Sequence, residues 1–212
     1  MAILKTITDK LNEGRQYRNV ADFEIREETE IDSKIVEGYA TTFNEPYELL
    51  SMDGYTVLEQ VDPDAFAECD MSDVIMQYNH EGRVFARTNN GTLKLQADDV
   101  GLRIRADLSG TQLGQQVYEE IKGGYTDKMS FGFRVKEDRQ EVTEDRENNT
   151  VTVLRTITKF QKLYDVSAVS IPANDATSIS ARSYGEGVIA EVMGEIQKRE
   201  AQKQKIRILM EI

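Results

Sequence analysis

The stretch Lys128–Val135, with the sequence KMSFGFRV, gives the clearest indication of the fold. Its apolar residues Phe131, Phe133 and Val135 alternate, which predicts a strand with these side chains on one face. Ser130 opens that strand and points to the opposite face. A small hydroxyl held by apolar neighbours suits a nucleophile that must stay still, although most serines at strand ends are merely polar. Partners elsewhere in the chain decide between these two interpretations.

The composition narrows the classes of function. The 212 residues are enough for one domain of ordinary size with tails. Hydrophobic residues make up 39% and charged residues 30%, which supports a core but leaves segments too polar to bury. A net charge of -12 argues against direct nucleic-acid binding. The single cysteine, Cys69, rules out an intramolecular disulfide and a cysteine-rich zinc site, and we expect it to be a packing residue.

Several common motifs are absent from the sequence. There is no apolar run of membrane-spanning length, and the N-terminus turns polar too soon for a signal peptide, so we expect a cytosolic protein that does not bind membranes. No glycine loop for phosphates and no dinucleotide fingerprint occurs. The acidic run at 137–147 lacks calcium-loop spacing. We therefore expect neither a cofactor nor a metal.

Strand patterns recur along most of the chain. They cover 20–28, 35–43, 55–61, 74–78, 84–87, 92–97, 102–108, 151–157 and 163–171. Many strands joined by short turns predict a mostly β protein with flanking helices. We expect its antiparallel sheet to close, or nearly close, into a barrel.

Helices and tails complete the predicted organisation. Asp62–Phe66 has the capping residue and the proline of a short helix, and 111–122 carries an apolar stripe ending at Gly123. The polar stretch 137–149 is read as an exposed loop or a long hairpin tip. Residues 1–19 form an arm, 20–182 the domain, and 183–212 a helical tail whose apolar cluster faces either the core or a partner.

The only histidine in the chain is His80, which follows a strand in the stretch Tyr78–Gly82. A serine nucleophile needs a base within hydrogen-bond reach, and histidine suits this task near neutral pH. Any serine–histidine chemistry within one chain must therefore use His80. The alternative is a turn histidine that is hydrogen-bonded to backbone or water.

Asp165 is the most suggestive third residue, because it lies among apolar and small residues in Leu163–Val169. A buried carboxylate is costly unless it is paired, and a carboxylate on the far ring nitrogen would orient His80. The alternative is that Asp165 occupies a solvent-facing or edge position. Periodicity alone leaves both possibilities open.

Five ordered motifs resemble those of the prohead (capsid maturation) proteases of tailed bacteriophages of the HK97 type. The resemblance covers about residues 20–182 and rests on the stretches Glu37–Phe43, Val61–Phe66, Tyr78–His80, Lys128–Phe133 and Asp165–Asn174. It implies a serine endopeptidase similar in fold to the herpesvirus assembly proteases, with a barrel surrounded by helices. The family's nucleophile matches Ser130, its histidine matches His80, and its acid, commonly Glu, matches the shorter Asp165.

The resemblance also implies partners and a place of action. Such proteases act inside the immature capsid in the host cytoplasm. They cleave the scaffold or the scaffold-like segment of the major capsid protein, and then often themselves. The arm 1–19 and the tail 183–212 are then candidates for self-cleavage or scaffold docking, and the tail helix for pairing with a second copy.

Two other functions remain to be weighed against a protease. The first is a scaffold or capsid-assembly protein that keeps the fold but does not cleave. The second is an acidic β-barrel that binds proteins, in which case His80 and Ser130 should be far apart. The joint presence of Ser130, His80 and Asp165 favours the protease, because a degenerate relative is expected to lose one of them.

Overall fold

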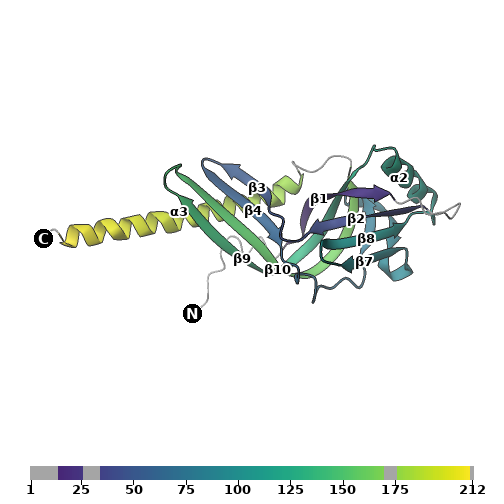
Figure 1. Cartoon of the computed structure of the whole chain (residues 1–212), viewed down its shortest axis with the longest axis horizontal. Coiled ribbons are helices and arrows are strands. Elements are labelled where there is room, and N and C mark those ends of the chain that lie inside the picture. The colour runs from purple at the N-terminus through teal and green to yellow at the C-terminus, as the bar shows by residue number, and fades with distance from the viewer. Residues whose placement is uncertain (1–13, 26–33, 170–175, 211–212) are drawn as a thin grey trace.

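A computed structural model describes residues 14–25, 34–169 and 176–210 (Figure 1). The strands are β1 Gln16–Ile25, β2 Ile35–Thr42, β3 Tyr47–Met52, β4 Tyr55–Val61, β5 Ile75–Tyr78, β6 Glu81–Arg87, β7 Leu93–Ala97, β8 Gly101–Asp107, β9 Lys128–Asp145 and β10 Thr150–Val169. They are accompanied by the 3-10 helix η1 Thr88–Asn90 and the helices α2 Gln112–Lys122 and α3 Ala176–Met210. The fold is mostly β with flanking helices, as predicted.

The prediction of a closed, antiparallel barrel is not supported. Hydrogen bonds join the described strands in the order β3-β4-β10-β9-β1-β2-β8-β7, with β5 and β6 attached beside β10. Neither end of this order pairs with the other. The sheet is also mixed, because β10 runs parallel to β4 and to β5. Alternation of apolar and polar residues indicates which face of a strand is buried. It does not indicate which strands pair with one another, or whether they pair in parallel or antiparallel.

The strands β9 and β10 are the longest of the described strands and pair with each other. The acidic stretch expected to be a loop or a long hairpin tip continues β9 as far as Asp145, opposite Thr150. Irregular pairing between Ile157 and Asp165 interrupts the register. Such bulges bend a strand pair, and one half of the pair lies beside β3 and β4 whereas the other half lies beside β1 and β5.

Two apolar clusters stabilise these halves. The larger holds the stacked rings of Phe131 and Phe133, with Phe160 edge-on to Phe133. In the smaller, the first turns of the tail helix pack on β4 and β10 through Tyr184 and Val188. The apolar cluster of the predicted tail therefore faces the core, and the helix begins at Ala176, before the expected boundary.

Three local predictions differ from the structure. The strand β1 begins at Gln16, so the last residues of the expected arm belong to the sheet. Asp62–Phe66 forms successive turns rather than a helix, although the Asp62 side chain does accept a bond from the Asp64 N–H. The strand β3 was not predicted. Helix α2, capped by Thr111, lies where the apolar stripe placed it.

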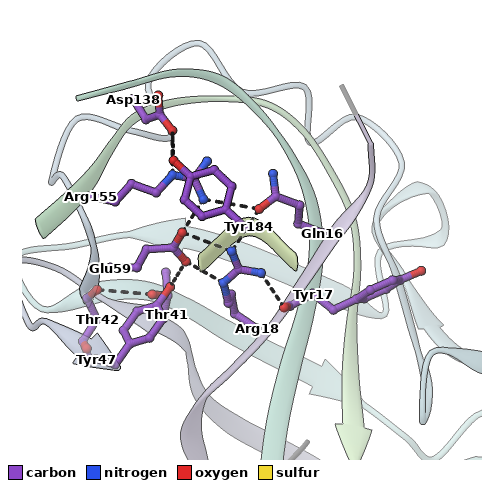
Figure 2. A network of polar contacts seen from close by, with 10 residues as sticks. All are labelled: Gln16, Tyr17, Arg18, Thr41, Thr42, Tyr47, Glu59, Asp138, Arg155 and Tyr184. Atoms are coloured by element: carbon purple, nitrogen blue, oxygen red, sulfur yellow. Dashed lines mark hydrogen bonds and ion pairs between the residues drawn. The ribbon is translucent and has the colours of Figure 1, made fainter. Parts of the chain in front are cut away.

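A buried ionic cluster ties β1 to β4 (Figure 2). Arg18 and Glu59 are at most 2% exposed, and Arg18 donates from Nε to Glu59 Oε1 at 2.6 Å and from Nη2 to Glu59 Oε2 at 3.1 Å. Arg18 Nη2 also donates to Gln16, and the Tyr47 hydroxyl donates to Glu59 Oε1 at 2.5 Å. The neighbouring Tyr17 ring points away from this cluster, as alternation along a strand requires.

The cluster extends through Arg155 to β9 and α3. Arg155 is fully buried and donates from Nη1 to Glu59 and from Nε to Asp138 at 2.6 Å. Its guanidinium carbon lies 3.9 Å from the centre of the Tyr184 ring. Burial would raise the pKa of Glu59, but Arg18 and Arg155 together lower it to about 2. Glu59 thus lies between two buried arginines, and Asp138 is a second anion beside Arg155.

We predict that Glu59→Gln lowers the free energy of unfolding by about 3–5 kcal/mol, because it removes the carboxylate paired with buried Arg18 and takes one of its anions from buried Arg155. Urea denaturation would measure the loss. The matched variant Glu48→Gln, on the exposed face of β3, should stay within about 0.5 kcal/mol of wild type. Equal stability of the two variants would show that the cluster contributes nothing.

The stabilising effect of Glu59 should also depend on pH. The folded pKa of about 2 lies below the ordinary value of 4.5, so the contribution is complete above pH 4.5 and is lost as the pH falls through about 2. The stability difference between wild type and Glu59→Gln should therefore shrink on acidification. A difference that stays constant between pH 7 and pH 3 would contradict this linkage.

Candidate active site

Ser130 lies in the middle of the sheet near the start of β9. Its neighbours Met129 and Phe131 are fully buried in the apolar core, so alternation turns the serine side chain to the opposite face. The serine backbone pairs with Asn19 of β1 on one side and with Ser167 of β10 on the other. Ser130 itself has no exposed surface. Two neighbouring strands and two core anchors therefore fix the position of this hydroxyl.

His80 lies at the tip of the β5–β6 hairpin. The loop contains only Asn79 and His80, with φ values of 49° and 60°. Positive φ at both loop residues is typical of a type I′ turn, which matches the twist of the flanking strands. The Asn79 N–H donates to the Ala168 carbonyl oxygen at 2.9 Å, which fastens the tip to β10. The left-handed backbone at a bulky residue stores strain, as is common at functional sites.

The structure brings the three predicted site residues together, although they come from three different strands or turns. The distance from His80 Nε2 to Ser130 Oγ is 2.6 Å, and that from His80 Nδ1 to Asp165 Oδ1 is 2.5 Å. Because a carboxylate only accepts, Nδ1 carries the ring proton and leaves Nε2 free to accept the serine proton. The His80 side chain remains 17% exposed.

Asp165 is fully buried, and both of its oxygens have donors. Oδ1 accepts from His80 and, at 2.8 Å, from the Ser167 hydroxyl, whereas Oδ2 forms an ion pair with Arg15. Burial would raise the pKa of Asp165, but the bond and charge of His80, the charge of Arg15 and the Ser167 bond together lower it. Of the two possibilities that periodicity left open, the structure has the buried, paired carboxylate.

Three further residues adjoin the site and were missed in the sequence. Arg15 and Tyr17 lie in the segment read as an arm, and nothing in their spacing indicates a role. The Tyr17 ring centre lies 4.2 Å from that of His80. Gly132 lies opposite Asp165 across β9–β10. A glycine that interrupts an alternating strand often marks a close approach, so this signal was available in Lys128–Val135.

Other reactive groups lie away from this site. Burial raises the pKa of the Cys69 thiol to about 12, which keeps it protonated, and its side chain packs against the main core. Within the described ranges, no group of three or more histidine, cysteine or acidic residues is arranged to hold a metal ion. Among the helices that the structure describes, none is long and apolar enough to cross a membrane.

The arrangement of hydroxyl, imidazole and carboxylate can accept the proton of a serine that attacks a carbonyl carbon. This proton transfer is the first step of acyl transfer to serine.

A family model for the caudovirus prohead serine proteases matches residues 21–188, a stretch that contains Ser130, His80 and Asp165. No curated protein and no solved structure matches the chain. Because the matched stretch covers well over half of its length, the chain belongs to the caudovirus prohead serine protease family.

Proposed function

We propose that the protein is a serine endopeptidase in which Ser130 is the nucleophile, His80 the general base and Asp165 the acid that orients His80. The observation that carries this proposal is the unbroken chain of short contacts, 2.6 Å from serine to imidazole and 2.5 Å from imidazole to carboxylate. Family membership supports protease activity in capsid maturation.

In the proposed reaction, Ser130 Oγ attacks the carbonyl carbon of the substrate while its proton passes to His80 Nε2. The imidazolium that forms is stabilised by the Asp165 carboxylate. The same proton then moves to the leaving amine, and the peptide C–N bond breaks to leave an acyl-serine. Water, deprotonated by His80, attacks this ester and regenerates the free hydroxyl.

The burial of Ser130 adds a requirement to this scheme. Since the residue has no exposed surface, a peptide carbonyl can reach its Oγ only after the side chains around it move. His80 retains 17% exposure and lies in a two-residue loop, so the path from solvent to the serine passes most directly beside this ring. Movements of loops that admit a substrate and then shut out water are common in hydrolases.

We further propose that the substrates are the scaffold or the scaffold-like segment of the major capsid protein, cleaved inside the immature capsid in the host cytoplasm. Self-cleavage within 1–19 or 183–212, pairing with a second copy, and a fold like that of the herpesvirus assembly proteases stay predictions. The alternative is an assembly protein that keeps the fold without cleaving. The complete set of contacts at Asp165 favours an enzyme, because a non-cleaving protein has no need of a buried ionised carboxylate beside its only histidine.

We predict that Ser130→Ala abolishes cleavage of the co-expressed major capsid protein, because it removes the oxygen proposed to attack the carbonyl. Gel electrophoresis would follow the capsid protein, and intact mass would follow the protease. His80→Ala should have the same effect. The matched variant Ser109→Ala, which removes a serine hydroxyl that bonds to Asp107 between β8 and α2, should cleave normally. Normal processing by Ser130→Ala would overturn the mechanism.

Asp165→Asn should lower the cleavage rate by about 10⁴-fold, because an amide can donate to Nδ1 and so favour the wrong imidazole tautomer. The rate constant for loss of full-length capsid protein is the quantity to measure. Glu37→Gln, at a buried carboxylate of β2 that accepts from Arg103, is the control for a lost buried charge outside the site. Equal rates in Asp165→Asn and Glu37→Gln would exclude Asp165 as the orienting acid.

A further inference from the structure

We infer that Arg15 is a positioning residue for the proposed site: its guanidinium fixes the rotation of the Asp165 carboxylate and so aims Oδ1 at His80. This inference rests on the proposed function of Ser130, His80 and Asp165. Arg15 lies outside the stretch 21–188 that matches the family. It also lies just before β1, in the part of the chain that its sequence marks as an arm.

The two oxygens of Asp165 have different partners. Oδ1 receives His80 Nδ1 and the Ser167 hydroxyl, whereas Oδ2 receives Arg15 Nη2. A carboxylate held on one oxygen alone can still rotate about its Cβ–Cγ bond, which changes the direction of the lone pair that faces the imidazole. A cationic donor on the second oxygen opposes this rotation, and bonds between charged groups are among the strongest available.

The guanidinium is itself held in place by aromatic rings. Its central carbon lies 5.1 Å from the ring centre of Tyr17 and 4.6 Å from that of Tyr164. Contacts of this kind attract a cation to the ring face and restrict its rotamers. Tyr17 also packs against His80, so one side chain touches both the base and the residue that orients the acid.

Gly132 makes room for this arrangement. A Cβ at Gly132 would overlap the Asp165 carboxylate, and it would lie 2.9 Å from the Tyr17 ring and 3.0 Å from Arg15 Nε. These are separations that real Cβ atoms do not tolerate without movement of a neighbour. The glycine thus leaves open the space in which β1, β9 and β10 bring arginine, tyrosine and aspartate together.

The core supports the same geometry from the other side of β1. Arg18 is locked by Glu59 beneath the strand, and this anchors the backbone from which Arg15 and Tyr17 reach the site. With its side chain 35% exposed, Arg15 can be substituted without opening a cavity in the core. A loss of function in Arg15 variants can therefore be separated from a loss of folding.

The test uses the full-length protein with nitrogen-15 in its single histidine. In a Ser130→Ala background, which prevents self-processing, the Nδ1 proton of His80 should resonate far downfield, as expected for a proton held by a carboxylate. Arg15→Gln should move this signal upfield or lose it by exchange with water, and Arg15→Lys should retain part of it. An identical signal in Arg15→Gln would overturn the inference.

The matched control is Arg103→Gln. Arg103, on β8, is likewise about one-third exposed and forms an ion pair with the carboxylate of Glu37 on β2. Its substitution should leave the His80 signal unchanged. The unfolding temperatures of Arg15→Gln and Arg103→Gln should be closely similar. This result would show that neither substitution acts by destabilising the fold.

A second arm measures cleavage of the major capsid protein with Ser130 intact. Arg15→Gln should be about ten- to a hundredfold slower, the loss expected from a small misplacement of a reacting group, and Arg15→Lys should recover part of the rate. Wild-type cleavage with no deficit in Arg15→Gln would overturn the inference alone. If wild type does not cleave, the proposed function fails, and the His80 signal still decides whether Arg15 positions Asp165.

Discussion

The register of β9 against β10 is the constraint on which the site depends. It sets Ser130 opposite Ser167 and Gly132 opposite Asp165, so that Ser130, Asp165 and the space between them share one face. A slip of one residue would carry every side chain to the wrong face of the sheet. Phe131 and Phe133, stacked at 4.7 Å on the opposite face, resist that slip because it would expose both rings. Packing of the apolar core therefore maintains the positions of Ser130 and Asp165 on the opposite face of the sheet.

The strand β1 links the buried ionic cluster to the site. Arg18 points into the cluster with Glu59 and Arg155, whereas Tyr17 points to the opposite face, against His80. The cluster in turn reaches Tyr184 on α3, so the tail helix, the core and the site share one set of contacts. A change in how α3 packs would thus reach β1, whose Tyr17 packs against His80.

Much of this could be predicted from local pattern. Alternation in Lys128–Val135 identified the strand and the face of Ser130, and the single histidine left one candidate base. Predictions from the sequence pattern failed where the structure depends on contacts between segments that are distant in the sequence. The Asp62 cap led only to turns, because the Ala65 carbonyl accepts from the Phe160 N–H of β10 and Asp70 already bridges to Lys162. Periodicity does not reveal that β10 pairs in parallel with β4 and β5. It also does not reveal that β3 and β7, the two ends of the described strand order, do not pair with each other. The role proposed for Arg15 becomes visible only when β1 is placed beside Gly132.

Covalent labelling can test the proposal that His80 activates Ser130 for attack. A fluorophosphonate should modify Ser130 in a preparation that is processing its capsid protein, and peptide mass mapping would locate the adduct. We predict that cleavage falls in proportion to modification of Ser130, and that His80→Ala prevents both. Continued cleavage with Ser130 fully modified, or labelling of Ser130 that is undiminished in His80→Ala, would contradict it.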